Sequence, residues 1–126
     1  MATSLRRKSK NNSLGAFGES VVANFLLDHG SEIIERNWRI KEGEIDLISL
    51  DRNKVFAFVE VKTRSSLSFG HPLEAISPEK LRRIQRLALA WLVTHQSFGC
   101  EYTIDCAAVL LAKDGTYTID YRADVR

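Results

Sequence analysis

The chain has 126 residues, of which 44% are hydrophobic, which is enough to bury one core and too few for two ordinary domains. Its net charge of +2 is uneven: the first 12 residues hold four of the 18 basic residues and no acid, which leaves 14 basic against 16 acidic residues in the rest. The body is therefore not a basic nucleic-acid binder by composition, and without an apolar run of about 18 residues or a secretory signal we expect a soluble, cytoplasmic protein that does not enter a membrane.

Residues 1–12 are predicted to be a disordered basic tail, either a solubilising leader or a non-specific tether to phosphate. The single domain then covers residues 13–126. Apolar residues recur at intervals of three and four from Leu14 onward, which predicts an amphipathic helix that has Ser13 as its N-cap and ends at Gly30.

Three strands are predicted next. The first covers residues 33–40, and the second covers residues 44–50. A turn at residues 51–54 leads to a third strand over residues 55–63, which is apolar on both faces until Glu60. That pattern is typical of a central strand.

A loop and a second helix follow these strands. Residues 64–76 have no clear period, so we expect a loop there. Ser77 and Pro78 then form a strong helix start, with serine as the cap and proline at the first helical position. This helix should end near Gln96.

Two more strands are predicted over residues 101–112 and 116–121, on either side of an Asp-Gly turn. The second and third strands look hairpin-linked, while the second helix serves as a crossover between the third strand and the fourth. We therefore expect an α/β fold in one domain, with a mixed central sheet flanked by helices, in the order helix, three strands, helix, two strands. Cys100 and Cys106 lack metal-ligand spacing and are expected to be buried free thiols.

Charged residues interrupt two of the most apolar stretches of the chain. Asp46 lies in the second predicted strand, and Glu60 and Lys62 lie in the third. A carboxylate on a buried strand costs several kcal/mol unless it is paired, hydrogen-bonded or bound to a metal. The pattern therefore predicts a site on this hairpin.

Strand alternation places Glu60, Lys62 and Arg64 on one face. Asp46 stands opposite Glu60 only if paired residues have numbers that sum to 106, which would pair Leu50 with Phe56.

Mg²⁺ or Mn²⁺ would suit such a pair, because a hard cation removes the repulsion between two carboxylates and takes oxygen ligands. Asp46, Glu60 and the carbonyl of Val61 are the candidate metal ligands. Lys62 would hold the attacking water or neutralise charge on a phosphate, and Glu60 beside it would keep its ammonium charged. A structural ion pair between Lys62 and a carboxylate, or a plain binding surface, are the alternatives.

Further candidates lie on the two helices. Glu19 falls at the edge of the first helix's apolar arc, so it either turns inward or stays at the surface. Lys80 falls within the buried face of the second helix. Three roles would explain this position: a phosphate contact, a partner for a site carboxylate or a snorkelling lysine. The candidates for contact with the nucleic-acid backbone, which could equally form a solvated face, are Arg64, Lys80, Arg82, Arg83 and Arg86.

These motifs resemble a known family. Gly-Glu-Ile-Asp-Leu-Ile at residues 43–48 and Phe-Val-Glu-Val-Lys-Thr-Arg at residues 58–64, with Asn-Trp-Arg at 37–39 and Phe-Gly-x-Pro at 69–72, are similar to the YraN-like family of uncharacterised bacterial proteins. That family is similar to the restriction-endonuclease-like, or PD-(D/E)xK, superfamily and especially to its Holliday-junction-resolvase branch. The resemblance spans residues 15–105 and implies a core of one helix, a three-stranded meander, a second helix and a further strand.

The resemblance also implies roles. It makes Asp46, Glu60 and Lys62 the catalytic set of a nuclease-like domain over residues 13–126, with Glu19 as the extra helix carboxylate of resolvase-type members and Lys80 at a family lysine position. No proline precedes Asp46, and Thr103 stands where an arginine is expected before Ile104 and Asp105.

It implies a Mg²⁺- or Mn²⁺-dependent endonuclease acting on DNA, branched or damaged, and by analogy with resolvases a homodimer. The alternative is a non-catalytic nucleic-acid-binding or protein-interaction module that retains the fold.

Overall fold

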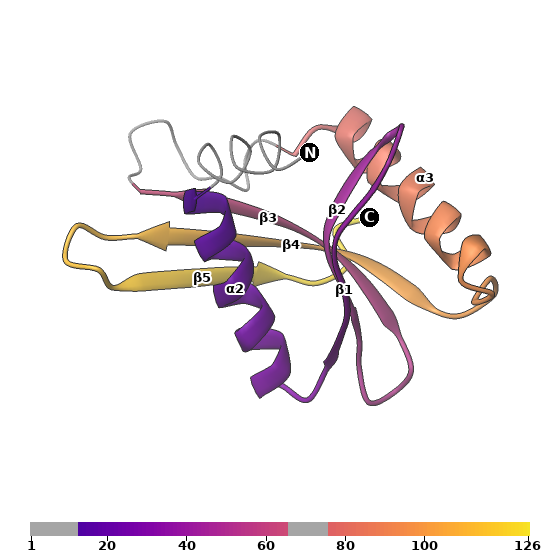
Figure 1. Cartoon of the computed structure of the whole chain (residues 1–126), viewed down its shortest axis with the longest axis horizontal. Coiled ribbons are helices and arrows are strands. Elements are labelled where there is room, and N and C mark those ends of the chain that lie inside the picture. The colour runs from indigo at the N-terminus through magenta and orange to yellow at the C-terminus, as the bar shows by residue number, and fades with distance from the viewer. Residues whose placement is uncertain (1–12, 66–75) are drawn as a thin grey trace, which may run out of the picture.

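The computed structural model describes residues 13–65 and 76–126 (Figure 1). Its elements are α2 (Ser13–Asp28), β1 (Glu32–Ile40), β2 (Gly43–Leu50), β3 (Phe56–Arg64), α3 (Pro78–Thr94), β4 (Tyr102–Leu111) and β5 (Tyr117–Arg122). This order confirms the predicted one. The predicted basic tail and residues 66–75 of the predicted loop lie outside the described residues, while Arg64, expected in that loop, is the last residue of β3.

The five strands form one sheet in the order β1-β2-β3-β4-β5. The pairing of β3 with β4 is parallel, and the other three pairings are antiparallel. A parallel pair needs a crossover connection, and α3 lies within it. The chain thus has the predicted mixed sheet.

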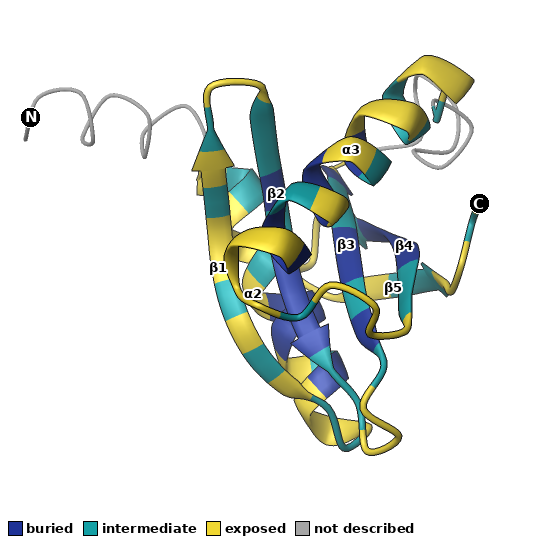
Figure 2. Cartoon of the chain, turned by 90° about the vertical axis from the view of Figure 1, so that its right-hand side faces the viewer, coloured by how far each residue is buried: buried dark blue, intermediate teal, exposed yellow. Residues whose placement is uncertain are grey.

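The helices cover opposite faces of this sheet. In Figure 1, α2 crosses in front of β3, β4 and β5, while α3 lies to the right of the sheet. Two separate apolar clusters result, one between α2 and the sheet and the other between α3 and the sheet. Figure 2 shows the consequence: the buried residues of the sheet lie on β2, β3 and β4, whereas β1 at the edge is largely exposed.

The start of α3 is as the sequence predicts. The side chain of Ser77 accepts a hydrogen bond of 3.0 Å from the backbone N–H of Lys80, and Pro78 is the first helical residue. The helix ends at Thr94, two residues before the expected end, because Gln96 has a φ of 55° that a right-handed helix does not contain. No helix within residues 13–65 and 76–126 is long and apolar enough to cross a membrane.

One cysteine prediction is wrong. Cys106 is buried on β4, but Cys100 is exposed, because it lies in the turn that follows α3 rather than on the strand.

A glycine sets the distance between α2 and β3. A Cβ on Gly18 would lie 1.9 Å from Oγ1 of Thr63, far inside any real contact. The Thr63 hydroxyl is buried, and no hydrogen-bond partner is found for it within the described residues. Close packing of α2 on β3 at this point is thus retained although the Thr63 hydroxyl has no hydrogen-bond partner among the described residues.

We expect Gly18→Ala to destabilise the protein by about 2 kcal/mol in urea unfolding, because the added methyl group overpacks the contact with Thr63. The double variant Gly18→Ala/Thr63→Ala should recover much of this loss. Ser20→Ala, at an exposed position of the same helix, is the matched control and should change little. Equal stability of Gly18→Ala and Ser20→Ala would contradict the prediction.

Candidate metal centre

The pairing of β2 with β3 has the register that the site requires. Leu50 pairs with Phe56 and the ladder continues to Leu47 and Val59, so paired numbers sum to 106 as predicted. Asp51 shapes the connection, since its Oδ1 accepts the N–H groups of Asn53 and Val55 at 2.8 and 3.0 Å.

The ladder opens at the next pair, Asp46 and Glu60. Pairing of β2 with β3 stops at Leu47, whereas its pairing with β1 continues to Gly43. Strand β2 therefore turns away from β3 at Asp46, which leaves an opening between the strands.

An irregularity in β1 and β2 accompanies this opening. Ile45 and Ile48 both pack in the cluster beneath α3, although residues three apart in a regular strand face opposite ways. Asp46 lies within the irregularity, and so does its cross-strand neighbour Asn37, whose φ is 52°. Asparagine tolerates this left-handed conformation better than most residues.

The Asp46 side chain replaces a main-chain partner in the opened ladder. Its Oδ2 accepts a hydrogen bond of 2.8 Å from the backbone N–H of Val61. In a continued ladder this N–H would bond to the main chain of Ile45. Because the N–H and C=O of one strand residue point to the same side, the Val61 carbonyl also faces the opening.

Glu60 is paired with a lysine from α3. Its Oε2 lies 2.7 Å from Nζ of Lys80, with the two side chains 14% and 26% exposed. Among the three roles considered for Lys80, the structure shows the lysine as a partner for a site carboxylate. Burial is the largest single influence and acts to lower the pKa of Lys80, but its hydrogen bond to Glu60 and its other interactions with Lys62, Glu60 and Asp46 together raise it.

This pairing corrects the expectation for Lys62. The neighbouring Lys80 ammonium lowers the pKa of Lys62, and burial adds to the effect. Glu60 acts in the opposite direction but is already paired with Lys80. The pKa of Lys62 is therefore lowered although Glu60 was predicted to keep this ammonium charged, and the structural ion pair, which was an alternative for Lys62, is made by Lys80.

Asp46 carries the most perturbed carboxyl of the site. Burial and then the charge of Glu60 raise its pKa to about 7, and the hydrogen bond from Val61 only partly offsets them. Two acids held this close are costly to ionise together, which a cation between them would reverse.

Glu19 turns inward from α2. It is half-buried and hydrogen-bonds the side chain of Asn37. Burial raises its pKa, and the charges of Glu44 and Glu60 add to the rise. The helix carboxylate therefore lies on the α2 side of the opening, within electrostatic range of Asp46.

The donors fit a hard divalent cation. Mg²⁺ and Mn²⁺ prefer oxygen ligands, and Mg²⁺ commonly takes only one or two protein carboxylates together with water and substrate oxygens. Asp46, Glu60 and the Val61 carbonyl supply such donors. Across the described part of the chain, no group of three or more His, Cys, Asp and Glu side chains could hold a metal, so these three donors would need water or a phosphate to complete the coordination.

The candidate arginines lie at the surface of β3 and α3. Arg64 is exposed at the end of β3, and Arg82, Arg83 and Arg86 are exposed along α3. Their contact with nucleic acid stays a prediction.

Two residues of this neighbourhood were not identified in the sequence. Asn37 could have been noticed, because asparagine tolerates positive φ and here interrupts a predicted strand. No local feature indicated Cys106, because its place beside Glu60 follows from the parallel register of β3 and β4.

Comparison with known proteins places the chain among relatives. Residues 18–123 match the model of the uncharacterised protein family UPF0102. The chain belongs to the UPF0102 family. A UPF0102 protein of Beutenbergia cavernae is 46% identical over 109 residues, covering 86% of this chain and 92% of that protein. One of Trichlorobacter lovleyi is 40% identical over 111 residues, covering 88% and 87%.

We expect Asp46→Asn to raise the stability of the metal-free protein by about 2 kcal/mol at about pH 8. An acid whose pKa rises on folding destabilises the fold once it ionises. The penalty is absent below the unfolded pKa, grows up to about pH 7 and is complete above it.

The gain should therefore vanish below about pH 4, as urea unfolding in EDTA would show. The asparagine side chain retains an oxygen for the Val61 N–H. Glu79→Gln, at an exposed acid of α3, should give no comparable gain. An Asp46→Asn variant less stable than the native chain at both pH values would contradict this prediction.

Proposed function

We propose that this UPF0102 protein is a Mg²⁺- or Mn²⁺-dependent endonuclease that hydrolyses phosphodiester bonds of DNA. The observation that carries the proposal is the opened β2–β3 ladder, where Asp46 and Glu60 come together beside the Val61 carbonyl and Lys62. The motif resemblance to the PD-(D/E)xK superfamily supports it. The same resemblance favours branched or damaged DNA as substrate.

The site contains the groups that hydrolysis of a phosphodiester requires. When bound, a divalent metal would polarise the phosphoryl group and activate water at neutral pH. The ammonium groups of Lys62 and Lys80 would neutralise charge that grows on the phosphate.

Purified protein should cut bulged, flapped or four-way DNA in Mn²⁺ or Mg²⁺ and not in EDTA. Asp46→Ala should reduce the rate at least about a hundredfold, because it removes a metal ligand. Glu79→Gln is the matched acidic control on α3 and should cut at the native rate. Equal cleavage by native protein and Asp46→Ala would indicate a contaminant and end the proposal.

A non-catalytic module is the second candidate, favoured by one observation. The ion pair between Glu60 and Lys80 already satisfies one of the two carboxylates without a metal. In such a module the charged cluster would only fix α3 against β3, and nucleic acid or protein would bind elsewhere on the surface.

Lys80→Gln separates the two functions in calorimetric titration with Mn²⁺. In a nuclease, loss of the competing ammonium should tighten Mn²⁺ binding by roughly threefold to tenfold, because Glu60 is released for the cation. Asp46→Asn is the matched control and should abolish the binding. In a structural module Lys80→Gln should only lower stability, and neither native protein nor variant should bind Mn²⁺ through these carboxylates.

A further inference from the structure

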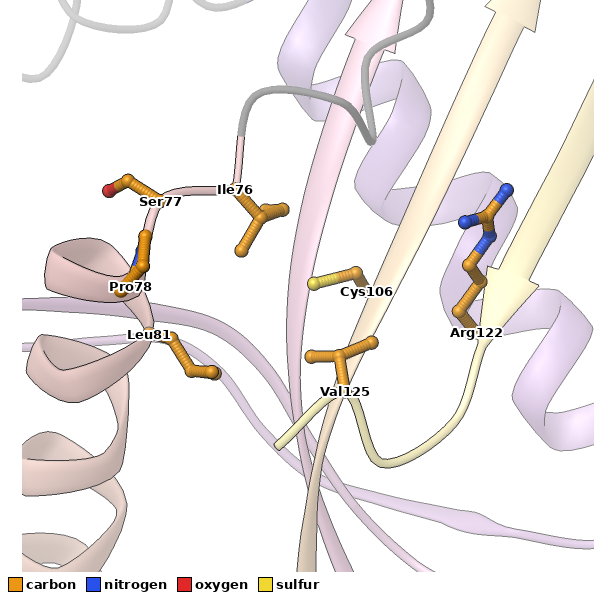
Figure 3. Close-up of a pocket in the computed structure, with 7 residues that line it drawn as sticks. All are labelled: Ile76, Ser77, Pro78, Leu81, Cys106, Arg122 and Val125. Atoms are coloured by element: carbon orange, nitrogen blue, oxygen red, sulfur yellow. The ribbon is translucent and has the colours of Figure 1, made fainter.

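A cavity of about 330 Å³ lies beside the metal centre on the α3 face (Figure 3). Its wall comes from the start of α3, from β4, and from the end of β5 with the segment after it. The lining residues are Ile76, Ser77, Pro78, Leu81, Cys106, Arg122 and Val125. In Figure 3 the Cys106 sulfur points toward the α3 side, and Arg122 lies on the opposite side.

The cavity adjoins the Glu60–Lys80 pair directly. Cys106 is the lateral partner of Glu60 in the parallel register of β3 and β4, and neighbouring strands lie about 4.8 Å apart. On the other side, Pro78 and Leu81 flank Lys80 in the first turn of α3. A ligand in the cavity would therefore lie one strand spacing from a group at the metal centre.

Hydrogen bonds fix the third wall. Asp105, only 4% exposed, accepts the Tyr121 hydroxyl and, at 2.9 Å, the Asp124 N–H. The Val125 N–H donates to the Ile104 carbonyl at 2.8 Å. Two β4 residues thus hold the chain after β5 in place, so Val125 forms a fixed surface. This is also the structural role of Asp105.

The chemistry of the cavity matches a nucleobase. Aliphatic walls from Ile76, Leu81 and Val125 suit a flat ring, and the volume lies in the range of about 300–1,000 Å³ typical of small-molecule sites. Arg122, which pairs with Asp120 at 3.3 Å, is the charged side chain among the lining residues, and the two lysines of the neighbouring site complement phosphate. The sugar separates the base of a nucleotide from its phosphate by a few bonds, comparable to the strand spacing of about 4.8 Å.

We propose that this cavity receives one unpaired nucleobase of a DNA strand whose phosphate lies at the metal centre. The inference rests on the proposed function and specifies its substrate. A paired base would have to leave its helix at a free-energy cost of a few kcal/mol. The cost is smaller for a base in a bulge, flap or junction. The cavity therefore selects DNA with unpaired nucleotides.

The test is fluorescence anisotropy with labelled duplexes, measured in EDTA with Mn²⁺ as a second condition. The native protein should bind a duplex with a one-nucleotide bulge about tenfold more tightly than a fully paired duplex. A bulge with an abasic nucleotide keeps the bent backbone but has no base, so it should lose this preference. An abasic bulge bound as tightly as the normal bulge would overturn the inference, because shape alone would then be recognised.

Two variants fill the cavity from opposite walls. Leu81→Trp and Val125→Trp should each reduce the preference for the bulge to less than about twofold, while binding to paired duplex is unchanged. The matched control is Leu89→Trp, which adds the same side chain at an exposed position of α3 outside the cavity. Circular dichroism identifies a variant that does not fold, and the other variant then decides. Preference retained in a folded filling variant would overturn the inference.

Failure of this inference is distinguishable from failure of the proposed function. The native protein could show metal-dependent cleavage that Asp46→Ala loses, and yet show no preference for the bulge. This result supports the proposed nuclease and overturns the inference about the cavity. Conversely, the native protein could show a base-dependent preference for the bulge that the filling variants remove, and yet cut no DNA with any metal. This result supports the inference about the cavity and overturns the proposed nuclease.

Discussion

The hydrogen bond from the Val61 N–H to the Asp46 carboxylate is the interaction on which the rest of the site depends. A strand N–H needs a partner, and β2 turns away from β3 at this point. Because an acidic side chain takes the place of the main chain, the ladder opens without leaving an orphaned donor. The opening then brings a second carboxylate, Glu60, near the first, and burial of Asp46 followed by the charge of Glu60 raises the pKa of Asp46 to about 7.

The charges around this opening are not balanced in the metal-free protein. Glu60 has Lys80, but Lys80 lowers the pKa of Lys62, and the hydrogen-bond partner of Asp46 within the described residues is a main-chain N–H. Perturbed carboxyl and ammonium groups that gather at one place cost stability, and proteins keep such arrangements mainly where a ligand relieves them. A cation relieves the acids, and a phosphate relieves the lysines. The imbalance therefore fits both the proposed metal and the proposed substrate.

The crossover explains why the candidate metal centre and the cavity are neighbours. Helix α3 connects β3 to β4, so its first turn lies over the strands that carry Glu60 and Cys106. One turn of helix supplies Lys80 to the candidate metal centre and Leu81 to the cavity. A parallel register places the two strand residues side by side. Recognition of a base and attack on its phosphate could thus be positioned by the same short segment.

Local sequence was sufficient for the elements and for the side-chain faces of β3, because helix starts such as Ser77-Pro78 and strand alternation depend on near neighbours. Alternation also required the numbers of paired residues in β2 and β3 to sum to 106 if Asp46 is to stand opposite Glu60. The observed register has this sum. The pairing of Glu60 with Lys80, which was one of three roles open for that lysine, and the cavity beside Cys106 could not be predicted in this way. Each depends on residues distant in the chain, which only the packed sheet and the crossover helix bring within a few ångströms.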